Sequence, residues 1–135
     1  MKSIVATVLA ASVLAFAIDA AAQTPAPTPP PAIKRTILQR SDIGNNMEVI
    51  LGLAEISPGG ATGRHSHFGV ETGMVIEGES SLEVEGATPR LIKAGDSYLI
   101  PAGKIHDAKT VGDKPLKVLA TYVVEKGKPL AIAAP

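Results

Sequence analysis

Three side chains that commonly bind metal ions lie within seven positions of one another in this chain: His65, His67 and Glu71. The chain has only one other histidine, His106, near the end of a second stretch rich in glycine and proline that begins at Gly95. Imidazole nitrogen and carboxylate oxygen suit divalent transition metals such as zinc, iron, manganese, nickel and cobalt. The sequence therefore raises the question of whether two distant segments bring these four residues to one point.

The spacing of these residues indicates which way their side chains point. His65 and His67 are two residues apart, so in a strand both side chains lie on one face. Glu71 is an even number of residues from both histidines, so in a continuous strand its side chain would lie on the same face. A bend at Gly69 could change that orientation. His106 must come from a different strand. Three imidazoles and one carboxylate would leave one or two coordination positions open for water or substrate, as in a catalytic site. The alternative, ordinary histidines in surface loops, is disfavoured because all three histidines fall within the two segments.

The elements that must position these residues are short strands. Strands are expected at 33–38, at 47–56 and around 64–67, and the glycine and asparagines of 41–46 predict a turn. Turn residues recur along the rest of the chain, and no segment after the N-terminal region holds a helical period. The pattern is typical of an all-β sandwich or barrel. The last residues, 129–135, are expected to be a loose tail or a strand that pairs across a dimer.

The N-terminal region predicts export. Residues 1–22 have a positive start, an apolar run and an alanine-rich site after which cleavage would follow Ala22, as in a signal peptide. An uncleaved anchor helix is the alternative, but the run is shorter than a bilayer span, so no stable membrane anchor is expected. Residues 23–32 form a proline-rich linker, and residues 33–128 form the β-barrel domain. The predicted location is periplasmic or secreted.

Composition limits the partners. Lysine plus arginine equals aspartate plus glutamate, 13 each, so the chain carries no basic excess for nucleic acid. The absence of cysteine excludes disulfides and thiol chemistry. The length allows one domain. A small-molecule ligand or substrate remains the expected partner.

Two motifs carry a resemblance to a known family. From Gly59 to Gly78 the chain reads G-x5-H-x-H-x3-E-x6-G, and from Gly95 to His106 it reads G-x5-P-x-G-x2-H. These spacings resemble the two signature motifs of the cupin superfamily, and one copy of the pair resembles a small single-domain monocupin of the cupin-2 type. The second motif usually continues to an asparagine, where this chain has Thr110. We expect that departure to affect local turn structure or pocket polarity more than metal binding.

The resemblance implies an all-β double-stranded β-helix, the jelly-roll or cupin barrel, over about residues 33–128. It also implies that His65, His67, Glu71 and His106 bind one divalent transition metal ion (Fe, Mn, Ni, Zn or Co) inside the barrel. The superfamily includes dioxygenases, decarboxylases, isomerases, sugar-binding regulators and storage proteins, so the fold does not define the function.

Two functions of different class remain open. The first is a secreted mononuclear metal-dependent dioxygenase or oxidoreductase acting on a small organic substrate, with Glu71 as both ligand and proton acceptor, as the resemblance to quercetinase-like cupins implies. The second is a non-catalytic cupin that binds a small molecule or metal as a sensor or carrier. A purely structural metal is a third possibility. The pattern places no second carboxylate or arginine beside the metal, which weakens oxalate decarboxylase-like or isomerase chemistry.

The pocket residues and the oligomeric state are predicted from residue type and strand edges alone, without a motif. Met74, Ile100, Ala108 and Tyr122 are candidates to line the pocket, with simple core residues as the alternative. A short jelly roll leaves an edge strand that needs covering, so a homodimer is expected through the strand at 116–124 or the one at 33–38.

Overall fold

The computed structural model describes residues 33–135, so the expected signal peptide and proline-rich linker lie outside the described residues. Between 33 and 135 the regular structure consists of strands alone, ten in number: β1 (Ile33–Gly44), β2 (Met47–Ile56), β3 (His65–Ser66), β4 (Gly69–Glu77), β5 (Glu79–Val84), β6 (Arg90–Lys93), β7 (Ser97–Ile100), β8 (His106–Val111), β9 (Leu116–Glu125) and β10 (Ile132–Ala133). In this part of the chain no helix is long and apolar enough to cross a membrane.

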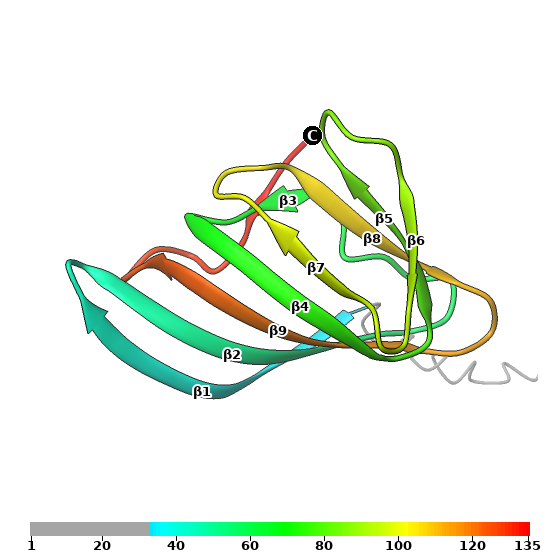
Figure 1. The fold of residues 1–135 in the computed structure, drawn as a ribbon, viewed down its shortest axis with the longest axis horizontal. Coiled ribbons are helices and arrows are strands. Elements are labelled where there is room, and N and C mark those ends of the chain that lie inside the picture. The colour runs from blue at the N-terminus through cyan, green and yellow to red at the C-terminus, as the bar shows by residue number, and fades with distance from the viewer. Residues whose placement is uncertain (1–32) are drawn as a thin grey trace, which may run out of the picture.

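The strands form two five-stranded antiparallel sheets that face each other (Figure 1). One sheet has the order β1-β2-β9-β4-β7, and the other has the order β10-β3-β8-β5-β6. The chain crosses repeatedly from one sheet to the other, so strands distant in sequence become neighbours. This arrangement is the double-stranded β-helix that the sequence predicted.

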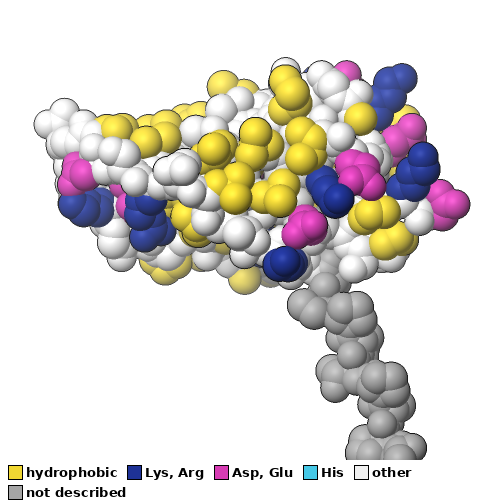
Figure 2. Space-filling view, turned by 90° about the horizontal axis from the view of Figure 1, so that it is seen from below, with side chains coloured by type: hydrophobic (Ala, Val, Ile, Leu, Met, Phe, Trp, Pro, Cys, Tyr) yellow, Lys and Arg dark blue, Asp and Glu magenta, His cyan; other side chains and the backbone are white. Residues whose placement is uncertain are grey.

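The core lies between the two sheets and follows from strict alternation along the long strands. Every second residue of β2 and β9 is buried, and the same holds for β4, whose inward positions include Glu71 and Val75. Burying an aliphatic side chain of this kind contributes about 1.5–3 kcal/mol. Side chains on the outer face of the first sheet are more exposed, and Figure 2 shows apolar groups gathered on the side viewed from below Figure 1. No histidine is visible on that face.

The strand predicted at 47–56 matches β2 at both ends. The first strand is longer than predicted, since β1 continues to Gly44 and the turn is confined to Asn45 and Asn46, both at positive φ. Antiparallel pairing with β2 extends over the whole of β1, with two register shifts that absorb the extra residues. Part of the segment expected to form the turn is therefore strand.

Two expectations about edges are wrong. The chain end is not a loose tail, because β10 pairs antiparallel with β3 of the same chain. Its other backbone edge has no partner strand within residues 33–135. The strand at 116–124 cannot be a dimer edge, because β9 lies between β2 and β4. The outer strands of this sheet are β1 and β7.

Glycine is required where the hairpin between β4 and β5 turns. Gly78 has φ of 80°, a conformation that residues with a side chain rarely adopt. A Cβ atom at this position would also lie 2.3 Å from the carbonyl oxygen of Pro115. The tight turn brings the end of β4 against the start of β9, and so fixes the register of the strand that carries Glu71.

Candidate metal centre

Three strands, β3, β4 and β8, bring the predicted ligands to one point. His65 lies in β3, His67 follows that strand, Glu71 lies in β4 and His106 begins β8, directly opposite His65 in the antiparallel register. All four side chains are buried, and their ligand atoms lie within 4.8 Å of one another. We call these four residues the ligand cluster. The two histidines and Glu71 all point inward, but they do not share one face of a strand, because β3 and β4 belong to different sheets.

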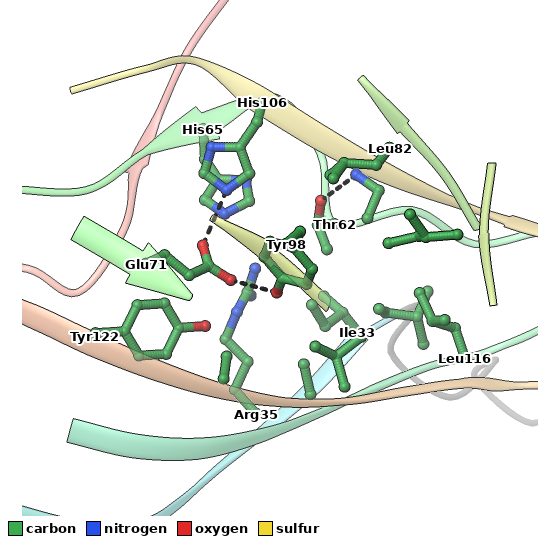
Figure 3. Close-up of a pocket in the computed structure, with 16 residues that line it drawn as sticks. Ile33, Arg35, Thr62, His65, Glu71, Leu82, Tyr98, His106, Leu116 and Tyr122 are labelled. Carbon is green, nitrogen blue, oxygen red and sulfur yellow. Dashed lines mark hydrogen bonds and ion pairs between the residues drawn. The ribbon is translucent and has the colours of Figure 1, made fainter. Parts of the chain in front are cut away.

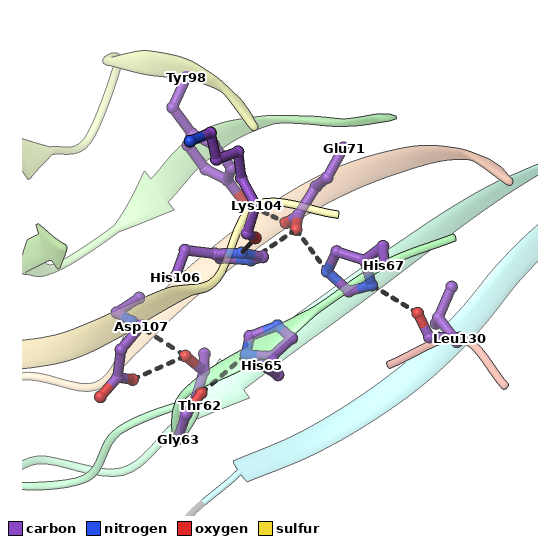
Figure 4. A network of polar contacts seen from close by, with 11 residues as sticks. Thr62, Gly63, His65, His67, Glu71, Tyr98, Lys104, His106, Asp107 and Leu130 are labelled. Atoms are coloured by element: carbon purple, nitrogen blue, oxygen red, sulfur yellow. Dashed lines mark hydrogen bonds and ion pairs between the residues drawn. The ribbon is translucent and has the colours of Figure 1, made fainter. Parts of the chain in front are cut away.

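Each histidine of the ligand cluster is oriented by a backbone carbonyl. His65 Nδ1 lies 2.7 Å from the Gly63 oxygen and His106 Nδ1 lies 3.0 Å from the Lys104 oxygen. His67 Nδ1 makes the same kind of contact with the Leu130 oxygen, in the C-terminal segment (Figure 4). Because a carbonyl oxygen only accepts, Nδ1 must carry the proton in each ring. In the neutral form of each imidazole the unprotonated nitrogen is then Nε2, the atom free to bind a metal.

The Nε2 atoms face the carboxylate of Glu71. Its Oε2 atom lies 2.8 Å from His67 Nε2 and 3.1 Å from His106 Nε2. The contact with His67 lacks the alignment of a hydrogen bond, so its Nε2 is a buried polar atom without a hydrogen-bond partner among the described residues. An imidazole lone pair this close to a carboxylate oxygen is unfavourable unless a positive charge lies between them. A divalent cation bound by Nε2 and Oε2 would supply that charge, so the residues present fit a metal ion.

The charges of the cluster are set by burial and by mutual contact. Burial would raise the pKa of Glu71, but the contacts with His106, His67 and Tyr98 outweigh it and hold that pKa well below its usual range. For His106, burial lowers the pKa, yet the hydrogen bond to Glu71 reverses the direction and the net pKa is raised. His65 lacks such a bond, and burial lowers its pKa to about 4. Near neutral pH, His65 is therefore neutral and Glu71 is ionised.

Tyr98 completes the hydrogen bonding of Glu71. Its hydroxyl donates to Glu71 Oε1 over 2.7 Å, which leaves Oε2 for the histidines (Figure 3). Burial and the Glu71 charge raise the pKa of Tyr98, so this hydroxyl keeps its proton. The contact depends on Gly73, because a Cβ atom there would lie 2.5 Å from the Tyr98 oxygen. The sequence reasoning missed Tyr98, which shares the inward parity of Ile100 in the strand before Pro101.

A cavity opens beside the ligand cluster (Figure 3). Its empty volume is ≈ 470 Å³, which includes space open to solvent. The cavity is narrow and suited to a small ligand. Its polar wall comprises Arg35, Thr62, His65, Glu71, Tyr98, His106 and Tyr122. Its apolar wall comprises aliphatic residues of both sheets, among them Leu82, Ile92, Leu116 and Val118.

The four predicted pocket residues have different positions. Ala108 and Tyr122 line the cavity. Ile100 is buried in the core and pairs with Glu71 across β4 and β7, but it does not line the cavity. Met74 was placed wrongly: its side chain is 49% exposed on the outer face of the sheet. It is an odd number of residues from Glu71, and alternation along β4 therefore turns it away.

Arg35 was missed for a related reason. The motif pattern placed no arginine beside the metal, and Arg35 is far from both motifs in sequence. It reaches the cavity because β1 pairs with β2, in a register that sets Arg35 opposite Ala54, another residue of the cavity wall. Only that long-range register reveals its place.

Polar contacts fix the segments on either side of the cluster (Figure 4). The Thr62 hydroxyl donates to Asp107 Oδ1 over 2.9 Å and accepts the Ala108 amide hydrogen, also at 2.9 Å. Thr110, which stands where the family motif has asparagine, donates to the carbonyl oxygens of Ser57 and Gly60. Its hydroxyl therefore holds the turn before the histidines. Thr110 does not line the cavity. The structure therefore supports the expected effect on local turn structure and not the one on pocket polarity.

The fold and the cluster define a class of protein: a single jelly-roll domain with three histidines and a glutamate gathered inside it. The family model for the cupin domain matches residues 52–122. The chain belongs to this family. No curated protein matches the sequence closely enough to be counted a relative.

Solved structures share the fold. The DMSP lyase DddQ from Ruegeria pomeroyi DSS-3 is 20% identical with a TM-score of 0.65, over 76% of this chain and 52% of the lyase. An oxalate oxidase in complex with the substrate analogue glycolate is 23% identical with a TM-score of 0.64, over 80% of this chain and 58% of the oxidase. A cupin superfamily protein from Desulfitobacterium hafniense DCB-2 is 20% identical with a TM-score of 0.59, over 69% of this chain and 78% of that one. The chain thus spans about half the length of the two enzymes, and at these identities the likeness shows the fold alone.

Proposed function

We propose that this cupin binds one divalent transition metal ion through His65, His67, Glu71 and His106, and that it is a metal-dependent enzyme acting on a small organic molecule. The observation that carries the proposal is the orientation of the ligand cluster: three Nδ1 atoms are engaged by backbone carbonyls, and the ligand atoms meet within 4.8 Å. Backbone partners of this kind orient metal ligands in proteins.

The proposed reaction class is that of a mononuclear dioxygenase or related oxidoreductase. A redox-active ion in this site would supply Lewis acidity to a bound substrate and would carry electrons from it to dioxygen. The residues of the chain hold the ligand atoms in place, exclude bulk water through burial and present a narrow cavity beside them. Tyr98 keeps one oxygen of Glu71 occupied. An oxalate oxidase bound to glycolate among the fold neighbours supports a small substrate.

Glu71 is supported more strongly as a ligand than as a base. Its pKa is held low because the contacts with His106, His67 and Tyr98 outweigh the effect of burial. A carboxylate of low pKa accepts a proton weakly near neutral pH, where an efficient general base has a pKa close to the working pH. Proton acceptance by Glu71 would require a substrate that displaces one of these contacts.

The alternative is a non-catalytic cupin that captures a small molecule or the metal itself. The narrowness of the cavity favours this candidate, because it admits little beside the ligand cluster. Oxygen consumption and substrate loss with iron-, nickel- or manganese-loaded protein, assayed against catechols, flavonols and small carboxylic acids, would separate the two. Tight ligand binding without turnover would contradict the enzymatic function and support the binding function.

Metal analysis tests the site itself. Protein purified from its own compartment should contain about one equivalent of a divalent transition metal. His106→Ala should lose most of it, because the variant removes one of four ligands. The matched control is Glu83→Gln, which alters an exposed surface carboxylate paired with Lys109. Metal-free wild-type protein that also fails to bind added metal would contradict the proposal.

We further propose that the protein is exported, by cleavage after Ala22, to the periplasm or the medium, and that it forms a homodimer. N-terminal sequencing of the exported protein tests the first proposal, with Gln23 as the expected first residue. Retention of residues 1–22 would contradict it.

A further inference from the structure

Arg35 occupies a particular position in the cavity. It is the one residue classed as exposed among those that line the cavity, so it marks the opening to solvent. Figure 3 shows its side chain running from β1 toward the group formed by Glu71, Tyr98 and Tyr122. Burial and the charge of Glu71 raise the pKa of Tyr122, and the nearby charge of Arg35 opposes that rise. The guanidinium group is therefore close enough to act on the cavity electrostatically.

The other cations of the same strand have partners. Lys34 Nζ lies 3.6 Å from Glu55 Oε2, and Arg40 Nε lies 3.3 Å from Glu48 Oε2. No ion pair or hydrogen bond found within residues 33–135 includes the Arg35 side chain. Among residues 33–135 the only carboxylate lining the cavity is Glu71, whose oxygens already contact Tyr98 and two of the histidines. Within the described part of the chain, Arg35 thus has a guanidinium group without a partner, which faces any ligand that enters the cavity.

The cavity offers little else to an anion at this end. The Tyr98 hydroxyl is already bonded to Glu71, and no hydrogen bond from the Tyr122 hydroxyl to a residue of the described segment is found. A guanidinium group binds carboxylate through two parallel hydrogen bonds, and it does so better where water is partly excluded. The empty volume of the cavity, ≈ 470 Å³ with space open to solvent included, suits a small anion.

We propose that Arg35 binds the carboxylate of a small organic acid at the opening of the cavity. This inference rests on the proposed function, because the other end of the acid would lie against the ligand cluster. Arg35 is then the residue that selects the substrate class, and the preferred ligands are monocarboxylates of a few carbon atoms rather than neutral compounds of the same size. A catechol or flavonol would make no use of this group.

Calorimetric titration of the metal-loaded full chain tests the proposal. The probes are acetate, propionate, butyrate and lactate, each beside its neutral amide. At least one acid should bind more tightly than its amide, and Arg35→Gln should weaken that binding by roughly 10- to 100-fold, the range for hydrogen bonds between charged groups. Arg35→Lys should retain part of the affinity, because it keeps the charge and loses the bidentate geometry. Binding of the amides should not change.

The matched control is Lys34→Gln, which removes the same charge from the neighbouring position, where the side chain pairs with Glu55 outside the cavity. The control should bind the acids as wild type does. Equal affinities for acids and amides, or equal losses in Arg35→Gln and Lys34→Gln, would overturn the inference.

Metal content measured on the same samples separates the two proposals. Wild-type protein that binds metal but shows no preference for acids contradicts the role of Arg35 alone. Wild-type protein that binds no metal contradicts the proposed function, and the comparison of Arg35→Gln with Lys34→Gln then decides the role of Arg35 on the metal-free protein. A melting temperature equal to that of wild type confirms that the Arg35 variants are folded.

Discussion

The Nε2 proton of His106 lies between that nitrogen and Glu71 Oε2, two of the atoms that would bind a metal ion. The raised pKa of His106 means that the imidazolium, donating to Lys104 through Nδ1 and to Glu71 through Nε2, persists above the usual histidine range. The burial that opposes this rise is outweighed by the Glu71 contact. His65, with a pKa lowered by burial to about 4, offers no competing proton near neutral pH. Metal binding through His106 Nε2 must therefore displace that proton.

Metal affinity should fall as the pH is lowered. Below the raised pKa of His106 each metal ion bound releases about one proton, so affinity should drop about tenfold per pH unit, and above that pKa it should level off. Competition titrations between about pH 6 and pH 8, with calorimetry in two buffers of different ionisation enthalpy, would measure both the slope and the proton released. An affinity that does not change over this range would contradict the displacement of a proton.

The sequence predicted the ligand cluster because its information is local. His65, His67 and Glu71 share a parity within one segment, and the spacing of the second motif supplied His106. Tyr98 and Arg35 were not predicted because each reaches the site through a strand register set by distant segments. Met74 was misplaced although its parity relative to Glu71 was already readable. The alternation of side chains along the strand is a better guide to the position of Met74 than its apolar character.

At the scale of elements, the C-terminal segment serves the site. β10 pairs with β3, the strand that carries His65, and the nearby carbonyl of Leu130 accepts the Nδ1 proton of His67. The pairing of β10 with β3 could not be predicted from the sequence, because a short stretch without clear alternation has no signature of its own. The long strands could be predicted from alternation and turn residues, whereas the pairing of a two-residue strand depends on the finished sheet.

Removing residues 129–135 should weaken metal binding by about 10- to 100-fold, the usual effect of losing an orienting partner of a ligand. Leu130→Ala is the matched control, because it keeps the carbonyl oxygen and removes only the side chain that packs on the core. The control should lower the melting temperature with little change in metal affinity. If the two variants bind metal equally well, the carbonyl contact does not orient His67.

At the scale of the whole molecule, the first sheet ends in an exposed strand. All but two of the residues of β1 are exposed, including Ile37, Leu38 and Ile43, and its outer backbone edge has no partner strand within residues 33–135. The apolar groups on the neighbouring face appear in Figure 2. The formal net charge of the chain is zero, so two copies would not repel each other through net charge. A second copy of the chain would cover this edge.

The homodimer expected from the sequence should therefore form through β1, since β9 is interior. Leu38→Lys should weaken dimerisation, because charged side chains on an edge oppose strand pairing. Leu91→Lys places the same charge on the exposed β6 strand of the other sheet and should leave the dimer intact. Sedimentation equilibrium at micromolar concentration would measure both. A wild-type monomer, or equal effects of the two substitutions, would contradict a dimer through β1.

The three backbone acceptors of the histidines have a consequence for sequence variation. A main-chain oxygen survives substitution of its own side chain, so the residues at 104 and 130 can change without removing the groups that orient His106 and His67. The path of the chain, rather than side-chain identity, therefore encodes the direction of those Nε2 atoms. A domain built in this way can alter its cavity wall extensively while keeping the same ligand geometry, which makes it a tolerant scaffold for redesigning substrate preference.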